Sequence, residues 1–215
     1  MVAPYLVTPT TEVLHPLGEF ASATVRVTDY DTADTTRVAD MAKTSTPVSE
    51  ELTAELDGAA EWLDLPVDEI LLAALTRTIA RTLGTGVVPI DIASERGSLL
   101  DAVPLICATA AQASATEVLA GVHRALAGAG EHVAAEPSEV YLNYIGEAPH
   151  ETVPVEETPP GLGHALEVRV YRAAGDVHVD WWYDTSRFED YTVEELAEQF
   201  PLALIEMTSD ALPPQ

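Results

Sequence analysis

Apolar side chains recur at steps of three and four through residues 66–84, the clearest hydrophobic pattern in the chain. This spacing predicts a helix with one buried face, and Pro66 suits its first helical position. A second helix is predicted over 115–128, because Ser114 and Glu117 have capping-box spacing ahead of another apolar stripe. Each of these helices needs a partner surface on which to bury its apolar face.

Weaker patterns predict three more helices. Residues 47–62 predict one that begins at a serine or threonine near its start. A short helix is predicted around Val38 and Met41, within a polar stretch. Near the C-terminus a second capping-box spacing begins at Thr192, so a helix should begin there and kink at Pro201.

Alternation with period two marks the predicted strands. Trp181 and Trp182 are neighbours in one of them, so one should lie in the core and the other at an interface or under a loop. Pro89 and Pro104 interrupt two apolar runs, which favours strands covered on both faces that lie at edges or bulges. The predicted strands are 23–28, 87–92, 103–107, 139–146, 166–171 and 177–183, with a turn at 174–176 joining the last two.

The order of these elements predicts an α/β fold, a layered sandwich of a mixed β-sheet with helices. The length of 215 residues fits one large domain, for which we predict the bounds 20–210. An extended arm at 1–19 precedes it, and a short tail at 211–215 follows. Residues 147–161 hold four prolines and four glutamates without a basic residue, which indicates a mobile acidic loop.

The charge balance excludes several classes of partner. The chain has 36 acidic and 10 basic residues, a formal net charge of −26. Nucleic acids and anionic membranes are therefore excluded as partners, because both bind clustered Lys and Arg. No apolar run is long enough to span a membrane.

Cys107 is the single cysteine, which rules out an intrachain disulfide and a cysteine-rich zinc site and favours a cytoplasmic location. The six histidines have no metal-ligand spacing, so the sequence predicts no bound metal or cofactor. Glu95 and Arg96 directly follow the strand at 87–92, where α/β folds commonly place working groups. A local ion pair is the alternative interpretation for these two residues.

Several segments occur together in an order that resembles a known family. They resemble the C-terminal lobe of condensation and epimerisation domains of nonribosomal peptide synthetases, relatives of the chloramphenicol acetyltransferase fold. The resemblance covers about residues 24–210. The segments are Asp-Glu-Ile-Leu-Leu-Ala-Ala-Leu-Thr-Arg at 68–77, the strand to Ile92, Tyr-Leu-Asn-Tyr-Ile-Gly at 141–146, His-Val-Asp-Trp-Trp-Tyr-Asp at 178–184, and the helix at 192–196.

Family members consist of two lobes, and their general base lies in a His-His-x-x-x-Asp-Gly motif on the N-terminal lobe, which this sequence lacks. Epimerisation domains also carry Glu-Gly-His-Gly-Arg where this chain reads Ala-Ser-Glu-Arg-Gly at 93–97. The resemblance therefore makes Glu95 an offset substitute for the family's acid. It implies that Asn143 and Tyr144 line the substrate channel, and we place Arg96 there as well.

The resemblance implies a half-domain associated with nonribosomal peptide or lipopeptide assembly, without a self-contained active site. Its partner would be a separate N-terminal-lobe protein or a second copy of the chain, with a carrier protein as a further candidate. An alternative is an acyl or aminoacyl transferase, or an epimerase, acting on phosphopantetheine thioesters of a carrier protein in a cleft completed by oligomerisation. A third is a binding protein that has kept the fold and lost the chemistry.

Overall fold

The computed structural model describes residues 23–32, 36–46, 49–93, 99–129, 138–147, 160 and 163–213. These residues form a six-stranded sheet of order β1-β6-β5-β4-β2-β3 and four α-helices. The strands are β1 (Met41–Thr46), β2 (Gly86–Ala93), β3 (Leu99–Cys107), β4 (Val140–Glu147), β5 (Leu166–Ala173) and β6 (Asp176–Asp184). The helices are α1 (Glu50–Leu63), α2 (Val67–Thr82), α3 (Ala115–Gly128) and α4 (Asp190–Asp210).

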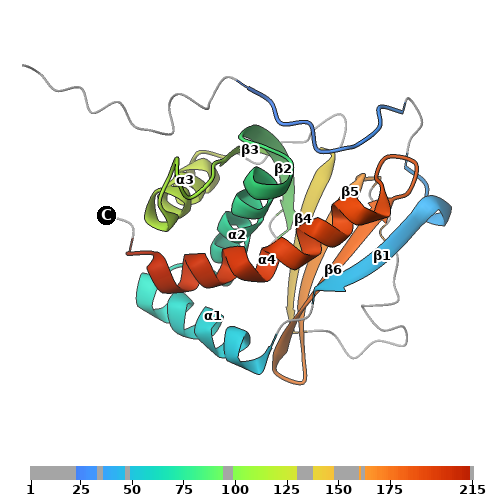
Figure 1. The fold of residues 1–215 in the computed structure, drawn as a ribbon. Helices are drawn as coiled ribbons and strands as arrows, with labels where there is room; N and C mark the ends of the chain where they lie inside the picture. The colour runs from blue at the N-terminus through green and yellow to red at the C-terminus, as the bar shows by residue number, and fades with distance from the viewer. Residues whose placement is uncertain are drawn as a thin grey trace, which may run out of the picture.

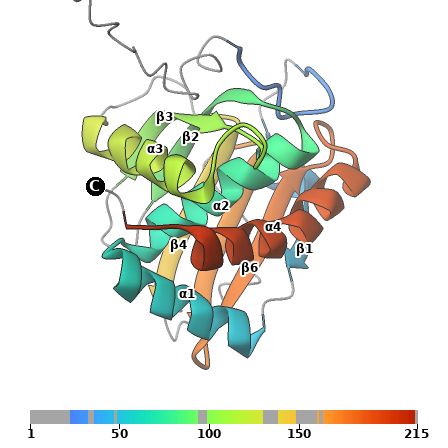
Figure 2. The same cartoon turned by 60° about the vertical axis from the view of Figure 1, so that its left-hand side comes forward.

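The sheet is mixed, which confirms the predicted fold class. β4 runs parallel to both β2 and β5, and the remaining neighbours are antiparallel. Ala174 and Gly175 both have positive φ in the tight turn between β5 and β6, as a hairpin with the right-handed twist of its strands requires. Both views of the ribbon show the four helices on one side of the sheet (Figures 1 and 2).

Side-chain caps begin two of the helices, α1 and α3. Ser49 caps α1 by accepting a hydrogen bond from the Leu52 amide, and Ser114 and Glu117 form the predicted capping box of α3. Pro66 lies one position earlier than predicted, at the N-cap of α2. That helix is buried on nearly all sides between the sheet, α3 and α4, which explains its almost continuous apolar sequence.

A buried polar relay joins α4 to the sheet. Pro201 lies inside α4 and has no N–H to donate to the carbonyl of Ala197. That carbonyl accepts instead from the hydroxyl of Thr46 at 2.9 Å, and the same hydroxyl accepts from the indole N–H of Trp181 at 2.7 Å. Trp181 also packs edge-on against Phe200. The core therefore satisfies the backbone group that the proline leaves without a donor.

The predicted strand at 23–28 is wrong as a strand. Only a single parallel bridge, between Thr24 and Val87, connects this segment to the sheet. Val25 and Val27 are buried as the alternation predicted, so the pattern correctly reported burial but not strand pairing.

Two other boundaries differ from the prediction. Met41 begins strand β1 and only Val38–Asp40 form a short 3-10 helix, because pairing with β6 decides the structure of this polar stretch. Helix α4 begins at Asp190, so Thr192 is a buried residue of its first turn and not its cap.

The strand that contains Pro104 is buried alternately at its described side chains, whereas β2 alternates only at its start and is buried on both faces at Ile90, Asp91 and Ile92, as predicted. The two prolines lie opposite each other in the β2–β3 ladder. β3 is an edge strand, as a proline favours, whereas β2 is interior and Pro89 precedes the part of β2 that pairs with β4.

The predicted arm at 1–19 and most of the predicted acidic loop at 147–161 lie outside the described residues, and the domain bounds stay predictions. Within the described part of the chain, no helix combines the length and the apolar character needed to cross a membrane.

Candidate functional site

The face of the sheet opposite the helices carries a set of polar and aromatic side chains. Side chains alternate along a strand, so residues aligned by the strand register point to the same side. Two adjacent rows cross the sheet on this side, and we call them the polar face. The first row is Asp91, Tyr141, Glu167, Trp182 and Lys43, and the second is Asn143, Arg169, Asp180 and Ser45.

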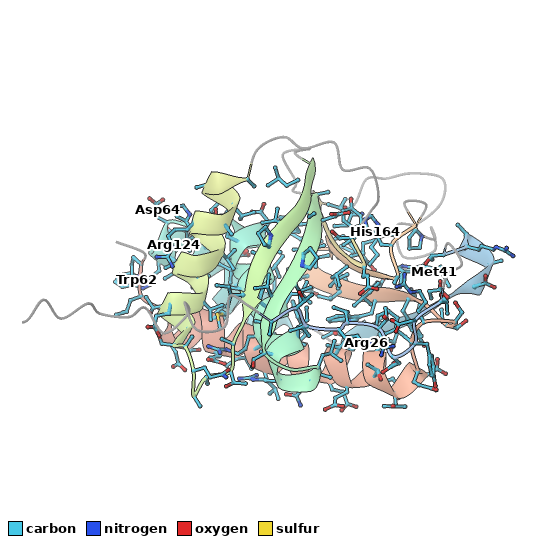
Figure 3. All side chains as sticks on the ribbon, turned by 90° about the horizontal axis from the view of Figure 1, so that it is seen from above. Arg26, Met41, Trp62, Asp64, Arg124 and His164 are labelled. Carbon is cyan, nitrogen blue, oxygen red and sulfur yellow. The ribbon has the colours of Figure 1, made fainter. Side chains whose placement is uncertain are left out.

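Asp91 and His164 form a buried pair at one end of the polar face. The Nε2 atom of His164 lies 2.8 Å from Oδ2 of Asp91, and both side chains are less than 5% exposed. The imidazole stacks on the ring of Tyr141 with 4.5 Å between centroids. His164 lies on the side of the sheet away from α4 (Figure 3).

Asp91 is held as an ionised carboxylate. Burial by itself would raise its pKa, but hydrogen bonds from the Ala102 amide, from His164 and from the Ser138 amide outweigh burial and lower the pKa. The amide contacts measure 2.6 Å to Oδ1 and 2.9 Å to Oδ2. The neighbouring phenol of Tyr141 stays protonated, because burial raises its pKa to about 12.

A second buried group joins β4 to β5. The Nε atom of Arg169 donates to Oε1 of Glu167 at 2.8 Å, and the amide of Asn143 donates to the same oxygen at 3.1 Å. Glu167 and Arg169 are both buried, so their charges are compensated by contact with each other. This pairing fixes the side chain of Asn143 on the polar face.

The polar face continues to the edge strand β1 through Trp182. The cationic groups of Lys43 and Arg169 lie 5.7 and 5.8 Å from the centre of its indole ring. Asp180 accepts hydrogen bonds from Ser45 at 2.5 Å and from Lys43 at 3.5 Å. Trp181, by contrast, lies in the core, so the two tryptophans face opposite sides as predicted.

The structure describes two of the four residues that the sequence proposed for a site, and they lie on opposite sides of the sheet. Asn143 lies on the polar face, half-buried. Tyr144, its neighbour, points to the other side and belongs to the hydrophobic core. Glu95 and Arg96 lie outside the described residues, so their roles stay predictions.

Sequence reasoning missed most of the polar face. The signal available was a charged residue at an outward position within an otherwise apolar strand, as at Asp91, Glu167, Arg169 and Asp180. Their convergence depends on the order and register of the strands, which the sequence pattern does not specify. His164 precedes β5. The only sequence feature that drew attention to this position was the glycine-containing segment directly before it.

The arrangement can hold and release protons and can bind polar ligand groups. A histidine oriented by a carboxylate is a proton acceptor, and a half-buried indole with adjacent amide and cationic groups offers a surface for an acyl chain or its carbonyl. Among the described residues, no group of three or more His, Cys, Asp or Glu side chains could hold a metal ion.

Comparison with known structures shows which fold this is. The epimerization domain from the third module of tyrocidine synthetase B matches with a TM-score of 0.62 and 14% identity, covering 88% of this chain and 53% of that chain. The EpoB NRPS cyclization-docking bidomain from Sorangium cellulosum matches with a TM-score of 0.65 and 14% identity, covering 91% and 47%. The condensation domain of the Monacolin K polyketide synthase MokA matches at 0.56 and 11%, covering 85% and 50%.

Among curated proteins, one component of the phenolphthiocerol/phthiocerol polyketide synthase of Mycobacterium tuberculosis is 35% identical over 228 residues. The match covers 84% of this chain but only 15% of that relative. No protein-family model matches the chain. The chain therefore has the fold of the condensation and epimerisation domains of nonribosomal peptide and polyketide synthases, and it covers about half of such a domain.

Proposed function

We propose that this chain supplies one wall of an acyl-transfer cleft of the condensation type in polyketide or nonribosomal peptide assembly. The second wall comes from another lobe, either a separate N-terminal-lobe protein or a second copy of the chain. The observation that carries the proposal is the polar face, a set of buried charges and aromatic rings on the side of the sheet opposite the helices. A fold of which the chain covers about half supports it.

Burying charged groups on a sheet face costs free energy unless each charge is paired with an opposite one. A face that served only to cover the sheet would be stabilised as well by apolar residues, as the helix side of the same strands is. The polar face fits a substrate with a polar carbonyl and an extended chain. The similarity to part of a polyketide synthase supports the thioester of a phosphopantetheine arm on a carrier protein as that substrate.

In this proposal Asn143 orients the substrate, and Glu95 and Arg96 contribute from the segment after β2. Tyr144 contributes indirectly from the helix side of the sheet, where it is part of the hydrophobic packing that holds β4 in place. The chain itself binds no cofactor and works in the cytoplasm, where its single cysteine stays reduced.

The test is the state of assembly. We expect size-exclusion chromatography with light scattering to show either a dimer or, after co-expression with the polypeptide encoded beside it, a stoichiometric complex. The assembled form, and not the monomer, should transfer an acyl group from a pantetheine thioester, and Glu95→Gln should reduce that turnover. A strictly monomeric chain that catalyses the transfer alone would refute the proposal.

A further inference from the structure

One ring nitrogen of His164 has no hydrogen-bond partner among the described residues. The atom is Nδ1. It is buried from bulk water, as is nearly all of the imidazole ring. Buried polar atoms in folded proteins nearly always have a partner, so an exception on a titratable ring calls for an explanation, and a group that binds there supplies one.

The partner of the other nitrogen determines what Nδ1 can do. Asp91 already accepts two backbone amides, and an ionised carboxylate has no proton to give. The contact with His164 is therefore an Nε2–H donating to Asp91. In the neutral ring the proton then lies on Nε2, which leaves a lone pair on Nδ1. The unpartnered atom is thus an acceptor in need of a donor.

We propose that Asp91 and His164 form a general-base pair, with Nδ1 of His164 taking the proton of an alcohol or amine acyl acceptor. The inference rests on the proposed acyl-transfer function and adds the acceptor class and a base within this chain. Asp91 is a positioning residue, since it fixes the tautomer and orientation of the ring and touches no substrate. Stacking on Tyr141 holds the ring plane.

The step balances without any further reagent. The O–H or N–H bond of the acceptor breaks and its proton forms a new bond with Nδ1, while the acceptor's oxygen or nitrogen attacks the thioester carbonyl carbon. The resulting tetrahedral intermediate collapses with cleavage of the C–S bond. The departing thiolate takes the proton from Nδ1, which returns His164 to its neutral form.

A purely structural pair is the competing explanation, because Asp91 also fastens the segments at Ala102 and Ser138. The substitution His164→Gln separates the two. A glutamine amide can occupy the place of Nε2 and donate to Asp91, but it offers no acceptor with the position and basicity of Nδ1. His123→Gln is the matched control, since His123 is an exposed residue of α3 in the helix layer.

The experiment measures acyl transfer from a pantetheine thioester to 1-hexanol or hexylamine by the assembled protein. We expect His164→Gln to lower kcat/KM about 100-fold or more and to remove the acidic limb of its pH profile, with the native circular-dichroism spectrum retained, whereas His123→Gln keeps wild-type kinetics. Full activity and an unchanged pH profile in His164→Gln would overturn the inference.

A second measurement separates this inference from the proposed function. In ¹⁵N NMR of the full chain, Nε2 of His164 should carry the proton, and the Nδ1 resonance should shift saturably as hexanol or hexylamine is added. If no protein form transfers an acyl group, the proposed function fails, and this titration alone decides the site. A proton on Nδ1, or an Nδ1 resonance that ignores both probes, would show that the pair is structural.

Discussion

Asp91 accepts hydrogen bonds from three donors that belong to different segments: the amides of Ala102 and Ser138, and His164. Replacing it with Asn places an NH2 group against at least one of these donors and removes the charge. We expect Asp91→Asn to lower the free energy of unfolding by about 2–3 kcal/mol. Urea unfolding followed by circular dichroism measures the change. Asp31→Asn is the control, since the side chain of Asp31 is 84% exposed, and it should stay within about 0.5 kcal/mol of wild type.

The same carboxylate should make stability depend on pH. Hydrogen bonds lower the pKa of Asp91 below its unfolded value of about 3.9, so in acid the unfolded chain binds more protons than the folded chain. The stabilisation is complete above the unfolded pKa and is lost as the pH falls through the folded pKa. The difference in urea midpoint between the wild type and Asp91→Asn should therefore shrink from about pH 5 to about pH 3.

The net charge of −26 acts in the opposite direction, because protonation of surface carboxylates relieves their repulsion as the pH falls. That effect is common to the wild type and the variant, so their difference isolates Asp91. Parallel pH curves for the two proteins would contradict the assignment.

Among the elements, the segment at 23–28 is attached to the start of β2, before the part of that strand that pairs with β4, by contacts that require a glycine. Gly86 has φ +152°, and a Cβ placed there would lie 2.3 Å from the carbonyl oxygen of Ala23. That carbonyl accepts from the Val87 amide at 2.7 Å, and the Val25 amide donates back to Val87 at 3.0 Å. The segment is drawn in blue along the top of the molecule in Figure 1.

We expect Gly86→Ala to displace this segment and to lower the free energy of unfolding by about 1–3 kcal/mol. Hydrogen exchange at the amides of Val25 and Val87 should speed up. Gly58→Ala is the opposite control: Gly58 is an exposed residue of α1, and a Cβ added there meets no other atom within 4 Å, so alanine should stabilise by about 0.5–1 kcal/mol. Equal effects at the two glycines would rule out the steric argument.

The relay from Trp181 to α4 gives a second prediction for an element. Thr46→Val keeps the shape of the side chain but leaves the indole N–H of Trp181 and the carbonyl of Ala197 without partners, which should cost about 2–3 kcal/mol. In a Pro201→Ala background the new N–H at 201 can serve that carbonyl, so the cost of Thr46→Val should be smaller there. A double-mutant cycle by urea unfolding measures the coupling, and zero coupling would show that the two sites act independently.

Local signals explain which elements the sequence predicts correctly. The capping box at Ser114 and the apolar period of α2 depend on residues three or four apart, and both appear in the structure. The polar residues of β1 become a strand only because β6 lies beside them, far along the chain. The alternation at 23–28 correctly predicted which side chains are buried. Whether the segment pairs as a strand depends on which strands of the sheet lie beside it, and this is not encoded locally.

The candidate site shows the same limit. Asn143 could be identified because it lies in a recognisable stretch of sequence, whereas Asp91 and His164 are 73 positions apart and no spacing rule joins them. Their contact follows from the parallel pairing of β2, β4 and β5, which brings the residues around these strands to one side. The opposite orientations of Asn143 and Tyr144 follow directly from strand alternation.

For the whole molecule, the two sides of the sheet differ in kind. One side is covered by four helices over a continuous apolar core, and the other carries buried paired charges, a buried stacked histidine and a half-buried tryptophan. A single lobe cannot surround a substrate with one such face, which is why the proposed function requires a second wall. Coverage of this face on assembly is therefore the property that a whole-molecule experiment should measure.

Lys43 is a built-in probe for that coverage. It is the only lysine of the chain, and it lies on the polar face at the edge strand with its side chain 30% exposed. An amine-reactive ester can therefore label only this side chain and the chain's α-amino group. We expect the labelling rate of Lys43 to fall about tenfold when the second wall binds. A side chain that is covered about 90% of the time reacts at about one tenth of its free rate. The α-amino group serves as the internal reference, and mass spectrometry distinguishes the two products. A complex that forms while Lys43 keeps its full reactivity would place the interface away from the polar face, and the helix layer would then become the surface to test.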